Sequence, residues 1–109
     1  MSYTLECSIP ADHPALAGHF PGNPVVPGVV ILEEVVLAVG AWRGDCRVAG
    51  VPLAKFIAPL QPERTFAIKL SGDERRVRFE CVQQGEMFAR GELSVKIAGV
   101  VQSPILSIF

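Results

Sequence analysis

Two hydrophobic patterns divide the chain. Residues 28–43 are apolar at almost every position, which predicts a helix from Gly28 to about Arg43. Beyond Asp45, apolar residues alternate with polar ones, as they do in half-buried strands. The apolar positions that share a strand face are Phe66, Ile68 and Leu70; Val77, Phe79 and Cys81; and Met87, Ala89, Gly91, Leu93, Val95 and Ile97. With turn residues at 71–74 and 84–85, this pattern predicts an antiparallel meander over residues 65–97.

Other segments complete the predicted elements. Residues 3–8 alternate weakly and predict a first strand, and Asp12-His13-Pro14 predicts one short turn of helix. Cys46–Leu60 predicts another strand, bent or bulged near Pro52, because proline donates no hydrogen bond to a ladder. Residues 18–27 contain three prolines and are therefore expected to be irregular.

The predicted helix has apolar side chains on every side, and a helix of this kind is normally buried on all sides. We therefore expect an α+β fold, in which a curved antiparallel sheet wraps around one long central helix in a single domain spanning residues 1–109. The sheet of one short chain cannot cover the whole helix. A second copy is expected to cover the open helix face or to pair with a sheet edge.

Composition narrows the classes of partner. Ten Lys and Arg residues stand against 11 Asp and Glu residues, and a net charge of −1 offers no long-range attraction to nucleic acid or anionic lipid. Three separated cysteines without a CxxC pair indicate reduced thiols in a cytoplasm, with neither a disulfide framework nor a zinc site. The apolar run 25–42 contains two glutamates, which excludes a membrane span, and residues 1–10 do not resemble a secretory signal.

Those two glutamates, Glu33 and Glu34, are the first candidate for chemistry. They lie about 100° apart on a helix without a polar face, so at least one must lie in low-polarity surroundings or in a cleft. A carboxyl group in such a place binds its proton more tightly, as a general acid requires. The alternative is that their negative charges only interact favourably with the positive N-terminal end of the helix dipole. That alternative is preferred for Glu34 and stays open for Glu33.

His19 is the second candidate. The prolines of its loop would hold the imidazole in one orientation, which suits proton transfer. The side chain of a lone histidine can also simply form a hydrogen bond within its own turn, and this alternative stays open. The loop ends at the start of the helix, where backbone N–H groups lack intrahelical acceptors. A base, a carboxyl group and a positive helix end could therefore border one cavity. His13 is interpreted as a surface residue near a helix cap.

The segment His-Phe-Pro-Gly-x-Pro-x-x-Pro-Gly-Val-x-Ile-Leu-Glu, from His19 to Glu33, closely resembles the active-site segment of the 3-hydroxyacyl-[acyl-carrier-protein] dehydratases, including those acting on hydroxymyristoyl chains. Lys55-Phe56, followed by Pro59-Leu60 and Pro62, is similar to a second segment of that family. The resemblance implies a hotdog fold, with paired subunits that form two tunnels at their interface. It implies a hydro-lyase that needs no metal and no organic cofactor.

The same resemblance implies a role for each site residue. His19 of one subunit would remove the C2 proton of a 3-hydroxyacyl thioester carried on acyl carrier protein. Glu33 of the other subunit would protonate the departing C3 hydroxyl, and the backbone N–H of Gly28 would bind the thioester carbonyl. Phe20 and Pro27 would border the substrate. The product would be a trans-2-enoyl thioester, in fatty-acid-like, lipid or polyene biosynthesis.

Some positions depart from the family pattern. Leu37 stands where these dehydratases often have a glutamine, and Pro62-Glu63-Arg64 replaces their usual Pro-Gly-Asp turn. The differences favour a specialised relative, whose acyl chain length no sequence pattern fixes. Two other functions stay open: a hotdog acyl thioesterase, and a non-catalytic acyl-binding or scaffold subunit. The protein itself is expected to form a homodimer or a larger homo-oligomer. The apolar residues 100–109 are expected to pack against the core or a partner.

Overall fold

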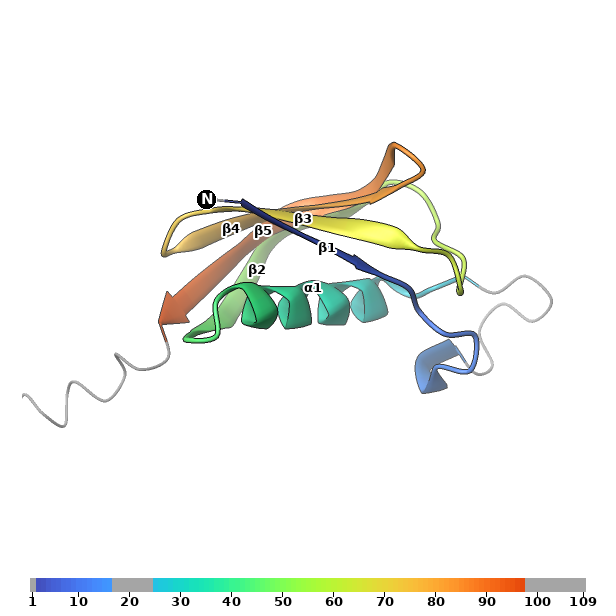
Figure 1. Ribbon diagram of the computed structural model, residues 1–109, viewed down its shortest axis with the longest axis horizontal. Helices are drawn as coiled ribbons and strands as arrows, with labels where there is room; N and C mark the ends of the chain where they lie inside the picture. The colour runs from blue at the N-terminus through green and yellow to red at the C-terminus, as the bar shows by residue number, and fades with distance from the viewer. Residues whose placement is uncertain (1, 17–24, 98–109) are drawn as a thin grey trace, which may run out of the picture.

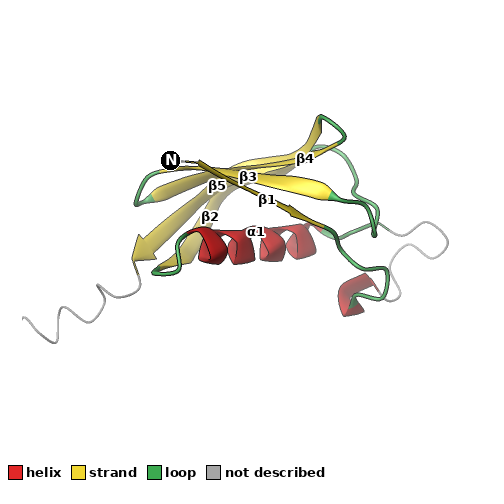
Figure 2. Cartoon of the chain, viewed as in Figure 1, coloured by secondary structure: helices red, strands yellow, loops and turns green. Residues whose placement is uncertain are grey.

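In the part of the chain that the structure describes, one α-helix packs on one sheet (Figures 1 and 2). The computed structural model describes residues 2–16 and 25–97. Within them the elements are, in chain order, β1 (Ser2–Cys7), the 3₁₀ turn η1 (Pro14–Leu16), α1 (Gly28–Trp42), β2 (Cys46–Phe56), β3 (Phe66–Gly72), β4 (Arg76–Gln83) and β5 (Glu86–Ile97). The predicted α+β class, the first strand, the short helical turn and the helix are confirmed. The expectation for residues 100–109 lies outside the described part of the chain.

The five strands form a single antiparallel sheet in the order β1-β3-β4-β5-β2. The predicted meander over residues 65–97 is β3, β4 and β5, and β1 and β2 are the edge strands. The ladder between β2 and β5 shifts register between Val48 and Gly50 and again between Gly50 and Leu53. The irregularity predicted around Pro52 is therefore confirmed, and it falls on an edge strand, where a missing N–H is tolerated.

The alternating pattern gives the core of β3 and β4 correctly but fails in β5. Met87 pairs with Val82, while Ala89 pairs with Cys81, so Phe88 is an extra residue in the ladder. Because of this bulge, the side chain of Phe88 is 4% exposed, whereas that of Met87 is 39% exposed. The prediction that Met87 faces the core is wrong. The Phe88 ring instead packs edge-on against Phe66, with 5.4 Å between ring centroids and an interplanar angle of 83°.

The helix α1 lies against one face of the sheet (Figure 1). It packs Val30, Ile31, Val35, Ala38 and Val39 into the core. At its C-terminal end Trp42 stacks on Tyr3, with ring centroids 6.1 Å apart, and the Arg43 guanidinium carbon lies 3.9 Å from the Trp42 ring centroid. These contacts fix the helix to the edge strand β1, and Tyr3 and Trp42 are packing residues.

The opposite face of α1 is open in the single chain. Val29 is 62% exposed and Leu37 is 65% exposed, and Val36 is exposed as well. The expectation that α1 is buried on all sides is therefore wrong for one chain, and a sheet wrapped around a long central helix is not confirmed. The physical reason is geometric, because a single sheet layer can cover only one side of a helix. No helix in residues 2–16 and 25–97 is long and apolar enough to cross a membrane.

Candidate active site

Glu33 is the charged residue on an otherwise apolar face of α1. That exposed face consists of Val29, Glu33, Val36, Leu37, Gly40 and Ala41. Glu34, one position on, is half-buried on another side of the helix, where its charge helps to raise the pKa of Cys7. The two glutamates therefore differ in surroundings, as their 100° separation predicts. Glu33 has the apolar neighbours expected for a general acid, but within one chain it is open to solvent.

A hollow of about 530 Å³ lies over this part of α1. It is lined by His13, Val29, Leu32, Glu33, Glu34, Val36 and Leu37. His13 comes from the segment before η1, where its backbone N–H bonds the Pro10 carbonyl at 3.1 Å. The sequence interpretation placed His13 on the surface and did not connect it with the glutamates. No local pattern could have done so, because only tertiary packing brings residues this far apart in the chain together.

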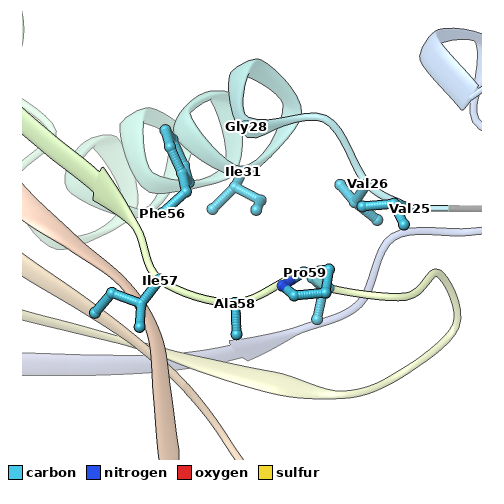
Figure 3. Close-up of a pocket in the computed structure, with 9 residues that line it drawn as sticks. Val25, Val26, Gly28, Ile31, Phe56, Ile57, Ala58 and Pro59 are labelled. Atoms are coloured by element: carbon cyan, nitrogen blue, oxygen red, sulfur yellow. The ribbon is translucent and has the colours of Figure 1, made fainter.

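A second hollow, of about 300 Å³, lies at the start of α1 (Figure 3). It is lined by Val25, Val26, Gly28, Ile31, Phe56, Ile57, Ala58, Pro59 and Leu60. Pro27 begins the helix with an extended backbone, and its carbonyl accepts the first helical hydrogen bonds from Val30 and Ile31. The first N–H groups of any helix lack intrahelical acceptors. This apolar hollow therefore borders a helix end suited to binding a carbonyl oxygen that gains negative charge.

Two chain segments hold the wall of this second hollow in place. The Val26 N–H donates to the Leu60 carbonyl at 2.8 Å. The N–H groups of Ile57 and Ala58 both donate to the carbonyl of Phe88, at 2.7 and 3.3 Å. Phe88, at the bulge in β5, thus accepts both hydrogen bonds at the point where the chain leaves the ladder after β2. Phe56 and this segment matched the family resemblance, but only the structure shows that they line a hollow with Gly28.

Gly28 is needed for the approach of Phe56. A Cβ added at Gly28 would lie 2.8 Å from the nearest ring atom of Phe56, which is too close for real atoms. Because the Phe56 ring is 46% exposed and can move aside, we expect Gly28→Ala to lower the stability of the fold by less than about 1 kcal/mol, as measured by the thermal unfolding midpoint. Gly40→Ala is the matched control, since a Cβ there meets nothing within 4 Å, and it should stabilise the helix slightly. A loss well above about 1 kcal/mol in Gly28→Ala would show that the Phe56 ring cannot move aside.

The structure brings some of the expected site residues together and leaves others apart. Gly28 lines the second hollow, at which Pro27 starts the helix, and Glu33 lines the first. Five helical positions separate Gly28 from Glu33, a rotation of about 140° around the helix axis. Within one chain the carboxyl and the Gly28 amide therefore open onto different hollows. His19 and Phe20 lie outside the described residues.

The cysteines are poor candidates for nucleophiles. Burial raises the pKa of Cys81 to about 12, and burial together with the nearby charge of Glu34 raises that of Cys7 to about 11. Burial also raises the pKa of Cys46. At neutral pH these thiols hold their protons, and a thiol is a weak nucleophile. All three are free, as the sequence predicts. In residues 2–16 and 25–97, no cluster of three or more His, Cys, Asp and Glu side chains could bind a metal ion.

Comparison with known families decides the classification. A sequence model of the ApeI-like family, described as ApeI dehydratase, matches residues 1–92. The chain belongs to this dehydratase family. A chain of the dehydratase heterocomplex ApeI:P from Xenorhabdus doucetiae superposes with a TM-score of 0.77 at 21% identity, covering 87% of each chain. This likeness shows that the fold is the hotdog fold expected from the sequence.

Two further comparisons place this ApeI-like chain among its neighbours. The 3-hydroxyacyl-[acyl-carrier-protein] dehydratase FabZ of Chlamydia trachomatis is 31% identical over 108 residues, covering 85% of this chain and 71% of that protein. The fluoroacetyl-CoA thioesterase FlK superposes with a TM-score of 0.61 at 12% identity, covering 100% of this chain and 95% of that chain. The thioesterase therefore shares the fold alone, whereas the dehydratase also shares sequence.

Proposed function

We propose that the protein dehydrates a 3-hydroxyacyl thioester carried on acyl carrier protein and releases the trans-2-enoyl thioester. Membership in the dehydratase family supports this reaction, as does the FabZ relative whose name specifies it. The structural observation that carries the proposal is Glu33, a carboxyl group set into an exposed apolar helix face of a chain of this family. The pathway is fatty-acid-like or polyketide-like biosynthesis.

The mechanism divides the proton transfers between two side chains. His19 removes the C2 proton, and electron density moves onto the thioester oxygen, where the Gly28 N–H stabilises it. Glu33 donates its proton to the C3 hydroxyl as the C3–O bond breaks, and water leaves. An apolar site favours the protonated carboxyl that this step consumes. Pro27 fixes the start of the helix, and Phe20 borders the acyl chain.

The proposed active unit contains two chains. Because Glu33 and Gly28 open onto different hollows of one chain, we place Glu33 of one copy opposite His19 and Gly28 of the other. The exposed apolar face around Glu33 then packs on the second copy, and α1 becomes central only in this assembly. Each copy is one domain over residues 1–109, in a homodimer or larger homo-oligomer, and the location is cytoplasmic. The similar chain from Xenorhabdus doucetiae belongs to a heterocomplex, so pairing of identical chains has to be tested here. Native mass spectrometry of the purified chain should show a dimer or a larger homo-oligomer.

A direct assay tests the reaction. Purified protein is mixed with a 3-hydroxyacyl carrier, or with a short 3-hydroxyacyl thioester mimic, and the absorbance of the conjugated enoyl product is followed. We expect the absorbance to rise without release of free thiol. Release of thiol without enoyl product would identify a thioesterase, which fits less well because identity to FlK is 12% and identity to the FabZ dehydratase is 31%. If neither enoyl product nor free thiol forms, the protein is an acyl-binding or scaffold subunit. Leu37, in place of the family glutamine, suggests this alternative.

A further inference from the structure

The side chains that neighbour Glu33 along its own helix are all apolar. Residues three and four positions apart on a helix are neighbours on its surface. For Glu33 these residues are Val29, Val30, Val36 and Leu37. None of their side chains can donate a hydrogen bond to a carboxylate or pair with its charge. The helix therefore sets the carboxyl group of Glu33 among hydrocarbon groups.

Leu37 is the neighbour placed to cover Glu33. Long side chains of a helix lean back toward its N-terminus, so each covers the turn that precedes it. Leu37, four positions after Glu33, therefore covers the turn on which Glu33 stands, and both residues line the hollow of about 530 Å³. Val30 is buried in the core instead. Val29 stands one turn before Glu33 and leans away from it.

The core of the single chain does not explain Leu37. Of the large apolar residues that the structure describes, it is the most exposed, at 65%. It lies on the side of α1 that faces away from the sheet (Figure 1). A leucine in this place acts on something outside the core, and its two neighbours there are the carboxyl of Glu33 and the second copy expected to pack on this face.

We propose that Leu37 is a positioning residue for the reaction: in the assembled protein it covers the Glu33 carboxyl and keeps its proton in place up to a higher pH than a polar residue there would allow. The inference rests on the proposed function, in which Glu33 is the acid and a second copy packs on this face. Exclusion of water from a carboxyl group disfavours its charged form, whereas a hydrogen bond to the carboxylate favours that form. Leucine provides the first effect and is incapable of the second.

Other titratable groups border the same space. Of the residues that the structure describes, His13 and Glu34 line the hollow with Glu33, His13 from the segment before η1 and Glu34 from α1. In the proposed mechanism, His19 of the second copy faces it as well. A carboxylate and a protonated imidazole act on a neighbouring carboxyl group in opposite directions. All three groups are present in every variant at position 37, so a difference between those variants reports the effect of residue 37.

An NMR titration of the Glu33 carboxyl carbon tests the proposal without any need for turnover. The protein is labelled isotopically at the glutamate carboxyl carbons, and the signal that disappears in Glu33→Gln identifies the residue. In Leu37→Gln the titration midpoint should lie about one pH unit below that of the wild type, the size expected for one hydrogen bond to a charged group. In Leu37→Met, which keeps an apolar side chain, the midpoint should equal that of the wild type.

Ala41→Gln is the matched control for the added amide. Ala41 is exposed on the same face of α1, two turns beyond Glu33 and about 12 Å from it along the helix axis. An amide there cannot reach the carboxylate, so the midpoint of Glu33 should stay that of the wild type. Each variant is titrated at a concentration at which native mass spectrometry shows it assembled as the wild type is.

The rate of dehydration gives a second readout, which separates proton affinity from a change of shape. At low pH, where Glu33 is protonated in both proteins, Leu37→Gln and the wild type should have equal kcat/KM. As the pH rises the wild type should become faster, up to about tenfold, which corresponds to a shift of one pH unit. A merely misplaced acid would lower the rate by the same factor at every pH.

The outcomes separate the role of Leu37 from the reaction itself. Equal midpoints in Leu37→Gln and the wild type would overturn the role of Leu37, even if the wild type dehydrates its substrate. A lower midpoint in the variant, with no dehydration by the wild type, would support that role and refute the proposed reaction. If Leu37→Gln does not assemble, Leu37→Ala decides, since it uncovers the carboxyl without adding a donor and should also lower the midpoint. Failure of both variants to assemble would show that Leu37 serves pairing alone, and the proposal would fall.

Discussion

Replacing Glu33 by Gln is expected to lower the rate of dehydration at least about 100-fold, the usual contribution of one acid–base group. The amide keeps the size of the side chain but has no proton of suitable acidity to give to the departing hydroxyl. Because Glu33 is exposed in the single chain and belongs to no core contact, the fold should be retained. The rate is measured from enoyl absorbance, and the fold from circular dichroism.

Glu34→Gln is a close control for this experiment. It removes the same charge at the next position of the same helix, from a side chain that borders the same hollow but is half-buried, whereas Glu33 is exposed. It should keep the rate within a few-fold of the wild type. Equal losses in both variants would show that the helix end needs negative charge in general, and a near-normal rate in Glu33→Gln would remove that residue from the mechanism.

The second large effect is expected for His19→Ala, with a loss of at least about 100-fold, because no other group in the proposed mechanism takes the C2 proton. His13→Ala is the control, since His13 is the other histidine of the chain and lines the hollow beside Glu33. If the order of the two losses is reversed, the base is His13, and the loop from which the family resemblance was read would lose its catalytic role.

Mixing the two inactive variants tests whether the site is shared. In a dimer of one His19→Ala chain and one Glu33→Gln chain, one site has both defects and the other has neither. Random pairing should therefore restore about one active site in four, although each variant alone is inactive. If both residues of a site came from the same chain, no mixture would recover activity. Recovery is measured after the variants are unfolded and refolded together.

The elements of this fold follow from local periodicity, and this is why the sequence predicts them well. Alternation over Phe66, Ile68 and Leu70 requires only that one strand face be buried, and all three are in the core. The start of α1 at Gly28 follows from Pro27, which favours an extended residue before the helix. The irregular stretch of β2 follows from Pro52. Each of these is decided by neighbours in the chain.

The features that were missed depend on partners distant in the chain. The bulge at Phe88 arises from the pairing of β4 with β5 and from the packing of Phe66, so alternation alone predicts Met87 instead. The number of apolar residues in α1 predicts that the helix is buried, but it does not show whether the same chain or a second copy covers each of its faces. The grouping of Arg47 with Lys96 and of Lys55 with Arg90 on one face of the sheet could not be read from a net charge of −1, because it exists only when the strands are in register.

The open face of α1 determines when a newly synthesised chain can become active. A protomer that carries its acid on the outside of its own helix has an incomplete reaction centre until it meets another. On the mechanism proposed above, an unassembled chain is chemically silent toward the thioesters around it. Assembly would then activate the enzyme, and the same step would bury the exposed apolar face of α1 that drives pairing.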